Sequence, residues 1–293
     1  MKFKSNVKVT QEAPVNFEDL MQDMDNVLNM ELEEAVEHLE DLTILEQNIS
    51  KYGVTEPVMH LVGGTLESMS ISIADKESCL EGLKEGLKEA GKKVWEVIVK
   101  IYEKIRDYVK GFIAKFNKEK FDELEDKFKG EKVNTNELDA TDLIPYKYIK
   151  YIIDFANDAE HDVGHDAEAW ARAYPELLVV HDTYGVHINA KFDKEVIESK
   201  FSSKGYSDLS MMFAVSSQLI DAMGKIEKAA EFCIKQSNIY LKLHENGQAN
   251  SKLYKGYRDT GKAISKLIPY CLRSATVANN IGKQAAKSGV KQQ

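Results

Sequence analysis

Seven acidic and imidazole side chains lie close together in the middle of the sequence and could carry chemistry. They are Asp154, Asp158, Glu160, His161, Asp162, His165 and Asp166. His161 and His165 are four residues apart, so on a continuous helix both imidazoles would lie on one face and could bind one metal ion. Asp158 lies one turn earlier on that face. These three residues are candidate ligands, and a metal-dependent hydrolase could be built on them.

A solvated helix end explains the same cluster without a metal ion. Gly164 lies between the two histidines and favours the end of a helix over a rigid support for ligands. The letters HDVGHD also differ from the HExxH pattern of zinc proteases. We therefore favour a polar helix end, expect neither a metal nor another cofactor, and keep His161, His165 and Asp158 as weak candidate ligands.

The rest of the sequence lacks the common signatures of an active site. Gly63-Gly64 is not followed by the Lys-Ser/Thr of a phosphate-binding loop. The three cysteines, Cys79, Cys233 and Cys271, are far apart and have no histidine close in sequence, so they form neither a metal motif nor a disulfide framework. Cys233 and Cys271 fall on apolar stripes and are expected in the core. We expect no enzymatic activity.

The composition describes a folded, helix-rich chain. Of its 293 residues 43% are hydrophobic and 30% charged, which is ordinary for a globular protein, and only five prolines interrupt helices. No run of about 18 apolar residues is present, so no membrane span is expected. The basic start is not followed by the apolar region of a secretory signal. We expect a soluble protein made in a cytoplasm.

The two ends of the chain carry opposite charge within a net charge of −9. Carboxylates dominate residues 12–90, whereas residues 251–293 hold one carboxylate, Asp259, against nine lysines or arginines. Cations of this end could contact DNA phosphates without reading base sequence. The candidates are Lys262, Lys266, Arg273, Lys283, Lys287 and Lys291. The alternative, which the sequence leaves open, is a solvated helix with cations favourably placed near its C-terminus.

Hydrophobic periodicity predicts an all-α fold, a helical bundle with at most one small β-hairpin. The spacing predicts an acidic helix over residues 16–49 and an amphipathic helix centred on Trp95 over residues 92–117. Two long helices, over residues 208–244 and 252–287, should form an antiparallel hairpin that closes the chain. Residues 177–188 are the only segment with much β character.

These elements suggest three parts of the chain. Residues 1–67 form an acidic, helical, propeptide-like segment. Residues 68–132 hold a linker and the Trp95-centred helix, and residues 133–293 form a C-terminal helical domain. The division follows the glycine pair before the first boundary and the highly charged connector before the second.

The order of motifs in the N-terminal part resembles a known family. LEEAVEHLEDL leads to YGVTEPVMHLVGGTLES and then to CLEGLKEGLKEAGKKVWEVIVKIYEKIRDYVKGF. Together these motifs resemble the internal head proteins of large tailed bacteriophages, over residues 30–115. The resemblance implies no catalytic residue. It implies entry into the prohead with the scaffold and capsid proteins, trimming by a prohead protease after a glutamate, and residence inside the capsid with packaged DNA.

The resemblance also implies a processing site. Thr65-Leu66-Glu67 precedes Ser68 at the matching junction, so the bond between Glu67 and Ser68 is the first candidate. Alternatives follow Glu85, Glu89 and Glu34. Removing residues 1–67 would take away much of the acidic excess and leave a nearly neutral product with a basic end, which would suit a protein that shares the capsid with DNA.

The resulting expectation is a structural virion protein of the phage head interior, made in the host cytoplasm and ejected with the DNA. Two alternatives stay open. One is an ejected effector that binds and inhibits a host defence protein. The weaker one is the metal-dependent hydrolase built on His161 and His165.

Overall fold

The computed structural model describes residues 87–115, 144–161, 167–181, 185–198 and 209–288, with single positions between 34 and 55 and between 122 and 130. These residues are mostly helical, and they contain one two-stranded antiparallel sheet. The predicted all-α bundle with one small hairpin is therefore confirmed. Among the described helices, none is both long enough and apolar enough to cross a membrane.

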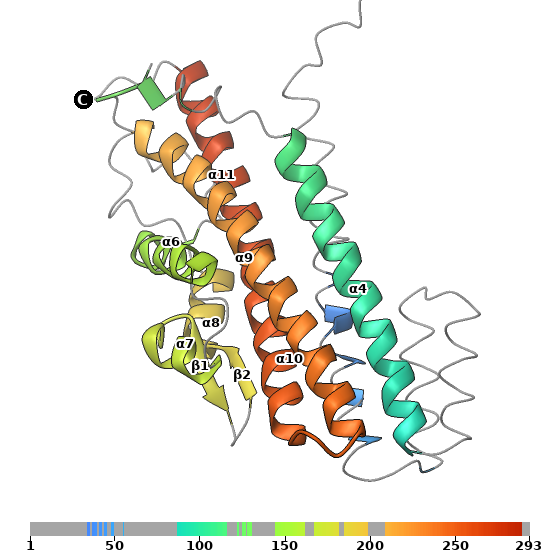
Figure 1. The fold of residues 1–293 in the computed structure, drawn as a ribbon. Helices are drawn as coiled ribbons and strands as arrows, with labels where there is room; N and C mark the ends of the chain where they lie inside the picture. The colour runs from blue at the N-terminus through green and yellow to red at the C-terminus, as the bar shows by residue number, and fades with distance from the viewer. Residues whose placement is uncertain are drawn as a thin grey trace, which may run out of the picture.

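Three helices from the C-terminal end form the axis of the bundle. Helix α9 (Leu209–Glu245) runs antiparallel to α10 (Ser251–Ser265) and α11 (Leu267–Ser288), as Figure 1 shows. The turn between α9 and α10 uses Gly247 at a φ of 73°, a left-handed conformation that suits glycine. Asn250 then caps α10 by accepting a 3.0 Å hydrogen bond from the backbone N–H of Lys252.

The second arm of this hairpin is not one continuous helix, contrary to the expectation for residues 252–287. It breaks at Lys266, between α10 and α11. Pro269 supplies the physical reason, because a proline lacks a backbone N–H and its ring clashes with the carbonyl four residues earlier. Proline is tolerated in the first turn of a helix, so α11 begins just before it.

Helices α10 and α11 form the centre of the molecule rather than its edge. Nearly every residue from Arg258 to Ala278 is buried. Two serines on α9 bind backbone carbonyls of these helices: Ser216 donates to Ala275 O at 3.0 Å, and Ser237 donates to Tyr254 O at 2.7 Å. Hydroxyl groups can thus be buried between closely packed helices because each one has an acceptor.

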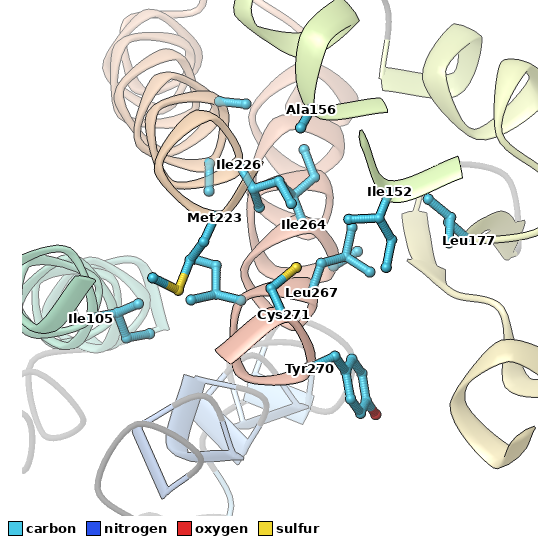
Figure 2. Packing of buried hydrophobic residues seen from close by; sticks show 14 of the residues in the cluster. Ile105, Ile152, Ala156, Leu177, Met223, Ile226, Ile264, Leu267, Tyr270 and Cys271 are labelled. Carbon is cyan, nitrogen blue, oxygen red and sulfur yellow. The ribbon is translucent and has the colours of Figure 1, made fainter. Parts of the chain in front are cut away.

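Helix α4 (Leu87–Lys115) packs along α9. Its predicted apolar stripe is confirmed, because the members that the structure describes are buried: Val94, Ile98, Ile101, Ile105 and Val109. In Figure 2, the side chains of Ile105 of this helix and Met223 of α9 point toward each other, and Cys271 of α11 lies on the other side of Met223. One hydrophobic core therefore includes residues from all three helices.

A smaller layer covers the other side of the central helices. It consists of α6 (Tyr146–His161), α7 (Ala167–Ala173), a β-hairpin and α8 (Ala190–Glu198). In the hairpin, β1 (Leu178–His181) pairs with β2 (Gly185–Ile188), and β2 lies against α10.

Helix α8 was not predicted from the sequence. It is short, and its start depends on Asn189, which accepts a 2.9 Å hydrogen bond from the backbone N–H of Lys191. Phe192 fixes its position by packing edge-to-face against Tyr148 of α6.

The N-terminal acidic segment contributes to the same core. Its described positions between 34 and 49 are helical, and their apolar members are buried: Ala35, Leu39, Leu42, Leu45 and Ile49. Burying a large aliphatic side chain stabilises a fold by roughly 1.5–3 kcal/mol. The parts before and after each proposed boundary thus share one hydrophobic core.

Candidate functional site

The acidic and imidazole cluster has structural partners where the structure describes it. Asp158 on α6 accepts a hydrogen bond from the Tyr174 hydroxyl. Glu160 forms an ion pair with Lys225 of α9 at 3.3 Å. Burial raises the pKa of Tyr174, and its hydrogen bond to Asp158 adds to the effect. Asp158 therefore links α6 to the end of α7, whereas Glu160 links α6 to α9.

The candidate histidine pair falls partly outside the residues that the structure describes. His161 is the last described residue of α6, and His165 lies outside the described residues. Among the positions that the structure describes, no three His, Cys, Asp or Glu side chains are grouped so as to hold a metal ion. His161, His165 and Asp158 remain candidates on sequence grounds alone.

The candidate DNA-contact residues divide into two sets. Lys262 is buried, with 8% of its surface exposed, and Lys266 and Arg273 are half-buried. The guanidinium of Arg273 lies over the ring of Tyr270, 5.2 Å from its centroid, a cation–π contact. These three cations are therefore at least partly packed within the bundle, Lys262 most deeply.

The remaining candidates lie near the C-terminus. Lys283 and Lys287 belong to α11, and Lys291 lies outside the described residues.

One cation and the one anion of the basic C-terminal end form a buried ion pair. Arg258, 1% exposed, meets its neighbour Asp259 through Nε and Nη2, each 2.8 Å from the same carboxylate oxygen. In the sequence, Arg258 is one of the nine cations of this end and Asp259 is its one anion. Because both are buried and paired, neither contributes much to the electrostatic surface that a partner meets.

The two described cysteines are core residues, as predicted. Cys233 and Cys271 are fully buried, and burial raises the pKa of each thiol to about 12. A thiol, rather than the reactive thiolate, is therefore present at neutral pH.

A row of polar contacts between α4 and α9 was not predicted from the sequence. Trp95 Nε1 donates to Asn238 Oδ1 at 3.3 Å, and the Tyr102 hydroxyl donates to the Glu227 carbonyl at 2.7 Å. Arg106 lies 3.7 Å from Glu231. The three α4 residues recur at helical spacing, a signal visible in the sequence, but nothing there identifies their partners.

Glu227 stands out in this row because its carboxyl group is buried between the two helices. Its Oε1 has no hydrogen-bond partner. Burial raises its pKa, nearby Glu231 raises it further, and the cations Lys110 and Arg106 lower it. By contrast, a hydrogen bond from Lys235 holds the pKa of Glu231 below its usual value.

The proposed processing positions differ in their surroundings. Glu34 is exposed, but Ala35 on the other side of that bond is 3% exposed within a helix. Glu89 lies in the first turn of α4. Glu67, Ser68 and Glu85 lie outside the described residues.

Comparison with known protein families matches residues 12–142 to the phiKZ-like phage internal head proteins. The match spans somewhat less than half of the chain and includes α4 with all the proposed processing positions. No curated protein and no solved structure matches the chain. Residues 12–142 are therefore similar to the phiKZ-like phage internal head proteins, and this similarity supports a virion protein of the phage head interior.

Proposed function

We propose that this internal head protein is made with an acidic N-terminal segment that a prohead protease cuts after Glu67 during head maturation. The observation that carries the proposal is the charge on either side of this bond. Residues 1–67 hold fourteen carboxylates and four lysines, a net charge of −10. Because the whole chain has −9, the remainder has +1. A remainder without net negative charge is suited to a capsid filled with DNA.

Local structure supports the bond after Glu67 over two alternatives. A protease binds its substrate in an extended conformation, so a bond inside a helix is cut only after local unfolding. The bond after Glu34 would require unfolding next to the buried Ala35, and the bond after Glu89 would require opening the first turn of α4. The glycine pair Gly63-Gly64 favours an accessible junction before Glu67.

We propose a binding role without enzymatic activity for the processed protein inside the head. Its contact with DNA would use Lys283, Lys287 and Lys291, the last three cations of the basic C-terminal end. The same proposal holds that the processed chain is ejected into the host together with the DNA. It predicts that the processed chain is found in the host shortly after adsorption, even when new protein synthesis is blocked.

The N-terminal residue of the protein in purified virions tests the processing step. Mass spectrometry should find a start at Ser68. A phage carrying Glu67→Gln should retain residues before Ser68, whereas the matched change Glu56→Gln should leave processing unaffected. An intact Met1 in mature virions would contradict the proposal.

A further inference from the structure

The acidic N-terminal segment is seated in the bundle by one apolar stripe. Leu39, Leu42, Leu45 and Ile49 recur at helical spacing, and each is at most 1% exposed. Figures 1 and 2 both show this segment, in blue, running beside α4, and Figure 2 places it near Cys271 of α11. The stripe thus fills a seam between elements that lie on the C-terminal side of the proposed cut.

The opposite face of the segment is exposed to solvent. Glu34, Glu37 and Asp41 are exposed, and so is Ile44, with 51% of its surface accessible, although the adjacent Leu45 is 1% exposed. An amphipathic helix with its apolar side in a groove is a common way for proteins to bind a separate peptide. The same geometry can therefore hold the segment without a covalent connection.

We infer that the seam between α4 and α11 is a peptide-binding groove whose occupant is the cut N-terminal segment, so that cutting after Glu67 does not by itself release residues 1–67. This inference rests on the proposed function. The cut lies beyond Ile49 in the sequence and removes no atom of the stripe. It removes only the connection that gives the segment a high effective concentration at its groove.

If the segment is retained, cutting of the chain and the change in its net charge become two separate events in maturation. While residues 1–67 stay bound, the complex keeps the net charge of −9 of the intact chain. The change to +1 takes place when the segment leaves, rather than when the bond is cut.

The test uses the full-length chain with the recognition sequence of a specific protease inserted between Glu67 and Ser68. After complete cutting, verified on a denaturing gel, gel filtration and native mass spectrometry report whether the two pieces remain together. The expected result is a 1:1 complex. A segment that elutes separately would overturn the inference, as would a remainder that precipitates while the segment stays soluble.

Two substitutions on adjacent residues identify the surface responsible. Leu45→Ala removes buried atoms and should speed dissociation of the cut segment roughly 30-fold or more. Ile44→Ala removes a similar side chain from the exposed face and should change the rate less than about threefold. Circular dichroism of the uncut variants verifies that both fold. Equal effects of the two substitutions would contradict binding through the stripe.

Virion analysis distinguishes this inference from the processing proposal. Purified heads that contain a chain starting at Ser68 together with residues 1–67 support both. A chain starting at Ser68 without residues 1–67, combined with separation of the cut pieces in vitro, supports processing and overturns retention. An intact chain in virions overturns processing, whereas a 1:1 complex in vitro would still support the groove.

Discussion

Trp95 of α4 donates its indole N–H to Asn238 of α9 across 3.3 Å, although 143 positions separate the two residues in sequence. Trp95 lies in the part of the chain that matches the internal head protein family, and Asn238 lies outside it. The Tyr102 hydroxyl joins the same two parts through the Glu227 carbonyl. The family region and the C-terminal helices are therefore one folded unit, so a change in either part should affect the stability of both.

Substitutions at this contact should reveal its energetic coupling. Asn238→Ala should lower the free energy of unfolding by about 1 kcal/mol, the usual net value of one hydrogen bond. Trp95→Phe should cost roughly 1–3 kcal/mol, because it also removes buried ring atoms. Urea unfolding followed by circular dichroism measures both. In a double-mutant cycle the two costs should be less than additive, and strict additivity would show that the residues do not interact.

The buried carboxyl of Glu227 should make stability depend on pH. Because burial raises its folded-state pKa above that of the unfolded chain, the group favours folding below the unfolded pKa, and this contribution disappears as pH rises through the folded pKa. Glu227→Gln removes the ionisation. The variant should be more stable than the parent by about 1 kcal/mol at pH 7.5, since an unsatisfied buried group costs about 1–3 kcal/mol. The difference should shrink at pH 4.

Glu231 provides the matched control on the same helix. Lys235 holds its folded pKa below the usual value, so Glu231 contributes stability above its unfolded pKa, and this contribution disappears as pH falls through the folded pKa. Glu231→Gln should therefore destabilise slightly at pH 7.5, by about 0–1 kcal/mol for a pair that solvent partly screens. Urea unfolding at several pH values measures both variants. The same sign of change for both at pH 7.5 would contradict this account.

Two helical glycines should respond oppositely to alanine. A Cβ on Gly261 would lie 3.2 Å from Cys233 Cβ and 3.3 Å from the Ala230 carbonyl oxygen, where α10 approaches α9. Gly261→Ala should destabilise by roughly 1–3 kcal/mol, as overpacking does. Gly111 on α4 is exposed, with nothing within 4 Å of such a Cβ. Gly111→Ala should stabilise by up to about 1 kcal/mol. Thermal unfolding compares the two variants.

The helices could be predicted because their apolar stripes repeat with helical spacing. The predicted apolar residues are buried in both helical segments: those between Val94 and Val109 on α4, and Ala35, Leu39 and Leu42 in the acidic segment. The break at Lys266 was missed although Pro269 signals it, because the apolar pattern continues across it. Helix α8 was missed because a nine-residue helix offers little periodicity. Periodicity identifies a buried face but not the depth of burial.

That distinction explains why the charged residues were the hardest to place. Lys262 and Arg258 look like surface cations in a sequence, since lysine and arginine are seldom buried. Both lie inside the bundle because α10 is enclosed by α9 on one side and by β2 on another. An arrangement of this kind depends on how distant segments pack, and local spacing does not encode it. For the same reason the contacts of Asn238 and Glu227 could not be predicted, because their partners lie more than a hundred residues away in sequence.

The cations near the C-terminus should make binding to duplex DNA dependent on salt. Each DNA phosphate that the protein neutralises adds about 0.9 to the magnitude of the slope of log affinity against log salt concentration. Lys283→Ala combined with Lys287→Ala should therefore lower the magnitude of that slope by about 1.8 if both residues contact phosphates. Fluorescence anisotropy with labelled DNA of random sequence, at several low salt concentrations, measures it on the full-length chain.

Controls of equal charge separate a local interaction from a general charge effect. Lys242 and Lys252 are exposed at the turn between α9 and α10, and replacing both with alanine removes the same net charge elsewhere. This variant should keep the slope of the parent, because counterions are released only where phosphates are bound. Lys262→Ala should lower the unfolding temperature instead, since its buried stem packs in the bundle. A slope that falls equally in both double variants would show that the C-terminal cations form no distinct DNA-binding surface.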